Sequence, residues 1–232
     1  MTAKLRIDLN CDMGEYPAAV VDGTQEALMR SVTSVNIACG GHAGDEAVMR
    51  ATIEQALRHG VAIGAHPGYA DRENFGRVEL KLAAEEVADS VYEQVAALAK
   101  IAESFGARIA HVKPHGALYN QAARDRLLAG AIAQGVARWR KDVVLVGLAG
   151  SVMLVAFREA GFAVAAEAFA DRRYEADGSL RSRKFTDALI RDPAEAAKQA
   201  LRIVERNEVI ACDGRAVAIT ARTICKIGRA HV

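Results

Sequence analysis

The sequence lacks the features that mark several classes of protein. No apolar run reaches the roughly 18 residues that a membrane-spanning helix needs. The first twenty residues have no basic start followed by an apolar stretch, so we expect no secretion signal. The four cysteines are scattered and form no Cys-x-x-Cys pair, which is typical of reduced thiols. We therefore expect a cytoplasmic protein without a disulfide framework.

An excess of charge of one sign is also missing. Lysine and arginine total 30 and aspartate and glutamate 29, which leaves a net charge of +1 and argues against non-specific binding of nucleic acids. The sequence has no Gly-x-x-x-x-Gly-Lys-Ser/Thr motif and no Gly-x-Gly-x-x-Gly motif after an expected strand, so no ATP site is visible. It also has no Gly-x-Ser-x-Gly segment, which argues against a serine hydrolase.

What the 232 residues do contain is an alternation of short apolar runs with amphipathic stretches. The expected strands are 5–9, 34–39, 62–66, 108–114, 143–149, 162–169 and 216–225, and the expected helices are 24–31, 44–59, 84–105, 121–139, 151–160 and 193–206. Strand–helix alternation favours parallel strands with right-handed crossovers. We predict a seven-stranded β/α barrel, one strand short of the usual eight, as a single domain over residues 1–226. A doubly wound open sheet is the alternative.

Polar residues collect at the carboxyl ends of these expected strands. Alternate strand residues of a barrel point into its lumen, and the carboxyl end of the barrel carries the active site. Burying many polar groups is costly unless they meet one another or a ligand. We therefore predict a functional site at this end, with a buried polar network that only orders the loops as the alternative. Lys113 lies in an apolar strand and needs an anionic partner, which a substrate carboxylate, a phosphate or Asp8 could supply.

A divalent metal is a further expectation at this end of the barrel. Imidazole and carboxylate groups suit zinc and similar ions, which makes Asp8, His42, His66 and His115 candidate ligands. No His-Glu-x-x-His segment or other compact ligand spacing supports the metal. General-base and oxyanion-donor roles for the histidines therefore stay open.

Six segments of the sequence resemble the LamB/YcsF family, and they follow in the family's order over nearly all of residues 5–225. They are 8–15 (Asp-Leu-Asn-Cys-Asp-Met-Gly-Glu), 36–45, 64–69, 74–77, 112–120 and 167–174. The resemblance implies a seven-stranded barrel related to the glycoside hydrolase/deacetylase folds. It also implies ATP-dependent opening of 5-oxoproline to glutamate, with ATP as co-substrate and with partner subunits B and C.

The resemblance also suggests roles for individual residues. We predict that carboxylates activate water, that histidines pass protons, and that Lys113 and Arg77 hold the anionic substrate and phosphate. The predicted catalytic residues are Asp8, Asp12, His42, His66, Lys113, His115 and Glu167. The predicted substrate-binding residues are Asn10, Glu15, Asn36, Asp45, Asn74, Arg77, Tyr119, Asn120, Asp171 and Arg172. The alternatives are a metal-dependent, deacetylase-like hydrolase and a non-catalytic substrate-binding subunit of a complex.

The last six residues form a separate case. Residues 227–232, Ile-Gly-Arg-Ala-His-Val, match the translation of one frame of a common sequencing adapter, so we predict a non-native tail. Family members usually continue from their last Thr-x-Cys to His-Gly-Asp, whereas Cys225 is followed here by Lys226 and Ile227. On this interpretation the native carboxyl-terminal segment is missing; a natural short tail is the alternative.

Overall fold

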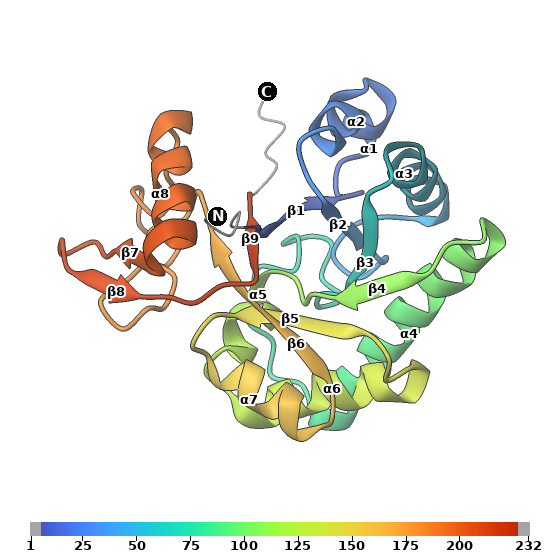
Figure 1. Ribbon diagram of the computed structural model, residues 1–232. Coiled ribbons are helices and arrows are strands. Elements are labelled where there is room, and N and C mark those ends of the chain that lie inside the picture. Colours follow the sequence, from blue (N-terminus) through green and yellow to red (C-terminus); the bar gives the residue numbers. More distant parts are fainter. Residues whose placement is uncertain (1–5, 227–232) are drawn as a thin grey trace.

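Seven parallel strands form a closed barrel in this computed structural model, which describes residues 6–226. The strand order around the barrel is β1-β2-β3-β4-β5-β6-β9, and β1 pairs with both β2 and β9 to close it (Figure 1). The strands are β1 (Asp8–Met13), β2 (Ser34–Ala38), β3 (Ala62–His66), β4 (Ile109–Val112), β5 (Val144–Leu148), β6 (Ala163–Phe169) and β9 (Thr223–Cys225). The predicted seven-stranded barrel is confirmed, and the open sheet is excluded. The predicted adapter-derived tail lies outside the described residues.

Two of the predicted strands differ from the observed ones by three or more residues at one end. We predicted a first strand over residues 5–9, but β1 spans Asp8–Met13 because its polar residues alternate with Leu9, Cys11 and Met13, which pack into the hydrophobic core. The predicted last strand, 216–225, is not one strand. Its first part is β8 (Ala216–Ala218), which pairs antiparallel with β7 (Glu208–Ile210), and only β9 joins the barrel.

Helices cover the outside of the barrel. Within residues 6–226 they are α1 (Pro17–Val21), α2 (Thr24–Met29), α3 (Glu46–His59), α4 (Ala84–Ser104), α5 (Gly116–Ala122), α6 (Arg126–Trp139), α7 (Val152–Glu159) and α8 (Pro193–Arg206). The predicted helix over 121–139 is in fact α5 and α6, because the Asp125 side chain accepts hydrogen bonds from the backbone of Leu127 and Leu128 and starts a new helix. None of these helices is long and apolar enough to span a membrane.

The apolar core lies between the strands and these helices. All five residues of β2 are buried, and Leu98 of α4 and Ile132 of α6 are fully buried on the helical side. The lumen of the barrel is different, because its side chains are largely polar. In Figure 1, α8 and the β7–β8 hairpin lie to one side of the barrel. Val217 and Ala218 of β8 form part of the wall of a cavity that Lys113 also lines.

Candidate active site

Asp8 lies at the start of β1, below the rest of the polar residues in the lumen. Its carboxylate accepts hydrogen bonds from three hydroxyl groups, Thr33 at 2.5 Å, Ser34 at 2.9 Å and Thr223 at 2.5 Å. These donors belong to β2, to the residue before it and to β9, so Asp8 ties β1 to both of its neighbours. The structure therefore does not bring Asp8 to the predicted metal ligands, and Asp8 is not the anionic partner of Lys113.

Lys113 follows β4 and places a fully buried ammonium group in the centre of the lumen. Its Nζ atom lies 3.0 Å from Asp12 Oδ1 and 2.9 Å from Glu167 Oε1. Burial alone would lower the pKa of Lys113, but the charges of Asp12 and Glu167 outweigh it and raise that pKa well above its ordinary value. Lys113 is therefore a permanent cation held between two carboxylates.

Two asparagine side chains orient these carboxylates. Asn10 Nδ2 donates to Glu167 Oε1 at 2.9 Å, and Asn36 Nδ2 donates to Asp12 Oδ1 at 2.8 Å. A hydrogen bond of 2.8 Å from Asn36 Nδ2 to Asn10 Oδ1 joins the two amides. Both residues were predicted to bind substrate, and the structure places them in the network that surrounds Lys113.

His111 on β4 joins this network through Asn36. Its Nε2 atom lies 2.8 Å from Asn36 Oδ1, and burial lowers the pKa of His111 to about 4. The ring passes over Gly64 on β3, where an added Cβ would lie only 2.1 Å from His111 Nε2. Only glycine at position 64 leaves room for the imidazole.

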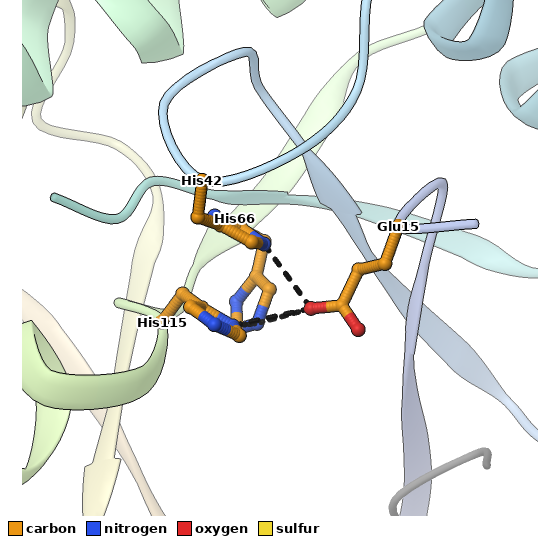
Figure 2. Close-up of side chains that lie close together, drawn as sticks. All are labelled: Glu15, His42, His66 and His115. Carbon is orange, nitrogen blue, oxygen red and sulfur yellow. Dashed lines mark hydrogen bonds and ion pairs between the residues drawn. The ribbon is translucent and has the colours of Figure 1, made fainter. Parts of the chain in front are cut away.

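Three histidines and a glutamate meet at the carboxyl ends of four successive strands. Glu15 follows β1, His42 follows β2, His66 ends β3 and His115 precedes α5 after β4. One ligand atom from each residue lies within 4.8 Å of all the others. Figure 2 shows the three imidazole rings facing the Glu15 carboxylate. We call these four residues the histidine cluster.

The histidine cluster combines two imidazoles of lowered pKa, His42 and His115, with an ionised carboxylate. Burial lowers the pKa of His42 to about 3, and it also lowers the pKa of His115. Burial opposes ionisation of Glu15, but its contacts with His115 and His42 outweigh this and lower the pKa of Glu15 to about 2. Asp12 Oδ2 lies 3.4 Å from His66 Nε2, so Asp12 connects the histidine cluster to the Lys113 network.

A cavity of about 1110 Å³ opens above both groups. Asp12, Lys113 and three members of the histidine cluster (Glu15, His66 and His115) line it. The predicted substrate-binding residues Arg77, Tyr119, Asn120 and Arg172 line the same cavity. The structure thus brings most of the predicted site residues to one hollow.

Three predicted binding residues occupy other positions. Asp45 caps α3, because its side chain accepts a hydrogen bond of 2.9 Å from the backbone of Val48. Asn74 Nδ2 donates to Asp71 at 3.0 Å within its own loop. Asp171 is not among the residues that line the cavity; burial lowers the pKa of Arg172, while the charge of Asp171 raises it.

The sequence reasoning missed Phe75, which acts through its backbone. Phe75 has a φ of 56°, in the left-handed region that non-glycine residues rarely adopt. Its carbonyl oxygen lies 3.0 Å from His115 Nε2. No sequence signal marks a carbonyl group of this kind, although the glycine that follows, Gly76, is typical of a sharp turn.

The sequence of this chain matches a known family of proteins. It belongs to the LamB/YcsF family, whose model matches residues 7–229. The structure of this family member therefore includes the barrel, the Lys113 network and the histidine cluster.

Similar proteins cover almost the whole chain. The 5-oxoprolinase A subunit of Chloroflexus aggregans is 52% identical over 97% of this chain and 89% of its own length. The 5-oxoprolinase A subunit of Bordetella pertussis is 51% identical over 94% of this chain and 87% of its own length. The crystal structure of the lactam utilization protein from Thermus thermophilus has a TM-score of 0.88 and 42% identity, covering 95% of this chain and 90% of that one.

Proposed function

We propose that this chain is the A subunit of a 5-oxoprolinase, which opens the lactam of 5-oxoproline to glutamate at the expense of ATP. The single observation that carries the proposal is the 51–52% identity, over nearly the whole chain, to proteins named as the A subunit of 5-oxoprolinase. The site supports it, because Lys113 and Asp12 line a cavity large enough for a small anionic substrate, and Glu167 holds Lys113 from behind the cavity wall.

The chemistry explains why ATP is required. A five-membered lactam is a resonance-stabilised amide and therefore a poor electrophile. Transfer of a phosphoryl group from ATP to the amide oxygen gives an imidate-like phosphate and ADP. Water then adds to the ring carbon, the carbon–nitrogen bond breaks as the nitrogen takes a proton, and a second water hydrolyses the resulting acyl phosphate to glutamate and phosphate.

The Lys113 network is suited to the charges that develop in these steps. Lys113 faces the cavity with a fixed positive charge, which stabilises negative charge on the attacked carbon's oxygen. Asp12 also lines the cavity, and its pKa lies well below its ordinary value: burial opposes ionisation, but its interactions with His66 and with the charge of Lys113 prevail. Asp12 is thus an ionised acceptor that orients a water molecule.

Arg172 and Arg77 supply further positive charge at the cavity. Arg172 is buried at the cavity wall, and its Nε atom has no hydrogen-bond partner among residues 6–226. A buried guanidinium nitrogen without a partner is matched by a carboxylate or phosphate oxygen. We assign the substrate carboxylate to Arg172 and the phosphoryl group to Arg77.

The proposal includes two partners and a location. Because the sequence carries no nucleotide-binding motif of the two kinds sought, we assign ATP to a site built with partner subunits B and C. Because ATP is a cytoplasmic substrate, we place the complex in the cytoplasm.

The test is reconstitution of the complex from this chain and the B and C subunits. Glutamate release from 5-oxoproline is measured with and without ATP, and with and without this chain. We expect glutamate only when ATP and all three subunits are present. Equal glutamate release without this chain, or none from the full complex, would contradict the proposal.

A further inference from the structure

Backbone carbonyl groups fix the proton on two rings of the histidine cluster. His66 Nδ1 lies 2.7 Å from the carbonyl oxygen of Lys113, and His115 Nε2 lies 3.0 Å from that of Phe75. A carbonyl oxygen only accepts hydrogen bonds, so both of these ring nitrogens carry the proton. In a neutral imidazole the other nitrogen then presents a lone pair. These lone-pair nitrogens are His66 Nε2 and His115 Nδ1.

The two lone-pair nitrogens face each other and an ionised carboxylate. His66 Nε2 and His115 Nδ1 are 3.0 Å apart, and Glu15 Oε1 lies 3.2 Å from His115 Nδ1 and 3.9 Å from His66 Nε2. Three acceptor atoms at such distances repel one another unless a positive charge lies between them. The protein supplies no N–H or O–H donor from these three groups to the point that they surround.

His42 adds a fourth atom to the same point. Its Nε2 atom lies 3.1 Å from Glu15 Oε1, and its ring stacks on that of His115 with centroids 3.6 Å apart. His42 Nδ1 is buried and has no hydrogen-bond partner within the described part of the chain. No protein group therefore fixes the proton on His42, so Nε2 can present its lone pair as well.

The spacing of the four atoms matches a metal site. A tetrahedral ion with bonds of about 2.0–2.1 Å has ligand atoms roughly 3.3 Å apart. The separations of 3.0, 3.1, 3.2 and 3.9 Å lie on both sides of this value, and all four atoms are within 4.8 Å of one another. Histidines that bind a metal usually donate their other ring N–H to a backbone carbonyl or a carboxylate. The carbonyl groups of Lys113 and Phe75 accept from His66 and His115 in this way.

We propose that Glu15, His42, His66 and His115 bind one divalent transition-metal ion, with Zn²⁺ as the best match to three imidazoles and a carboxylate. Glu15, His66 and His115 line the cavity, so the ion can enter from solvent and keeps a side open toward a bound molecule. The sequence suggested Asp8 as the carboxylate ligand, but the structure places Glu15 beside the three histidines instead. The inference does not depend on the proposed lactam chemistry.

The test is metal binding by the purified full chain. After dialysis against a chelator, Zn²⁺ is titrated by competition with a chromophoric indicator, and Co²⁺ is added separately to record its visible spectrum. We expect one equivalent of tightly bound Zn²⁺ and the intense Co²⁺ absorption that tetrahedral coordination gives. Loss of a supporting group around a metal site lowers affinity roughly 10–100-fold, so loss of a ligand in Glu15→Gln should lower it by at least about 100-fold.

A matched control is His59→Ala, which removes an imidazole outside the histidine cluster, bonded to Glu26 at 3.1 Å. This variant should bind Zn²⁺ as the wild type does. Glu15→Gln keeps the size and shape of the side chain, and circular dichroism establishes that it is folded. If the wild type binds no Zn²⁺, a proton shared by His66 and His115 fills the site instead and the proposal is wrong. Equal affinity in folded Glu15→Gln would also overturn it.

Discussion

Lys113 places a positive charge in the buried lumen of the barrel. An uncompensated buried ammonium group costs several kcal/mol, and the two carboxylates at 2.9 and 3.0 Å offset this cost. Breaking such a buried pair commonly destabilises a protein by about 3–5 kcal/mol. Burying three charged groups costs desolvation free energy that an apolar core would not require. This cost favours a role beyond folding for the Lys113 network.

Gly64 tests how tightly the lumen is packed. In Gly64→Ala the new Cβ would lie 2.1 Å from His111 Nε2, so His111 must move and its hydrogen bond to Asn36 is lost. We expect Gly64→Ala to lower the free energy of unfolding by about 1–3 kcal/mol, measured by urea denaturation. Gly130→Ala is the control, because its Cβ meets nothing within 4 Å in α6 and should stabilise by about 0.5–1 kcal/mol. Equal effects of both substitutions would refute the packing argument.

The sequence predicted well those site residues whose position follows from strand parity. Asp8, Asn10 and Asp12 alternate along β1 and all point into the lumen, as expected. Parity could not say which acid meets Lys113, because that depends on the register between strands distant in sequence. The sequence left a substrate carboxylate, a phosphate and Asp8 open as partners, while the observed pairing places Asp12 and Glu167 beside Lys113.

At the scale of elements, several aspartates have a role in folding because they cap the first turn of a helix. Asp45 caps α3, as Asp192 caps α8 and Asp125 caps α6. The family motif at 36–45 suggested substrate binding for Asp45, but a motif does not distinguish a helix cap from a ligand contact. The hydrogen bond to Val48 accounts for the carboxylate without any substrate.

Asp45 gives a prediction at this scale. Asp45→Ala should lower the free energy of unfolding by about 1 kcal/mol because the cap of α3 is lost. Asp45→Ser keeps a capping oxygen, so its free energy of unfolding should fall by much less than that of Asp45→Ala. Thermal unfolding of both variants beside the wild type measures the difference. Equal stability of the alanine and serine variants would mean that the cap is not what Asp45 contributes.

The strands were predicted where apolar runs are short and bounded, as in β3, which spans the residues expected. The hairpin of β7 and β8 was missed because a three-residue strand has too few positions to show alternation. The turn at Phe75 and Gly76 was missed for another reason: its function lies in a carbonyl oxygen, and every residue has one.

At the scale of the whole molecule, buried neutral histidines make stability depend on pH. The pKa of His111 is about 4 in the folded protein, below its ordinary value of 6.5, because burial disfavours the charged ring. Between these values the unfolded chain binds a proton that the folded chain does not. Stability is therefore complete above about pH 6.5 and is lost as the pH falls toward 4.

We expect His111 alone to contribute up to about 1.4 kcal/mol of lost stability per pH unit in this window. Urea denaturation at pH 7 and pH 5 measures the change. His111→Gln cannot titrate, so the fall between the two pH values should be smaller than in the wild type, while His42 continues to contribute. An unchanged pH dependence in His111→Gln would show that His111 titrates alike in both states.

The central claim is that the polar residues at the mouth of one barrel open the lactam. Its most direct test is the rate of glutamate formation by the reconstituted complex with Lys113→Met in place of the wild type. Removing a well-placed charge stabiliser commonly lowers the rate by about 10²–10³, and we predict a loss of that size. Arg108→Met, which removes an exposed cation paired with Asp142, is the matched control and should keep the wild-type rate. A folded Lys113→Met chain that supports the wild-type rate would contradict the claim.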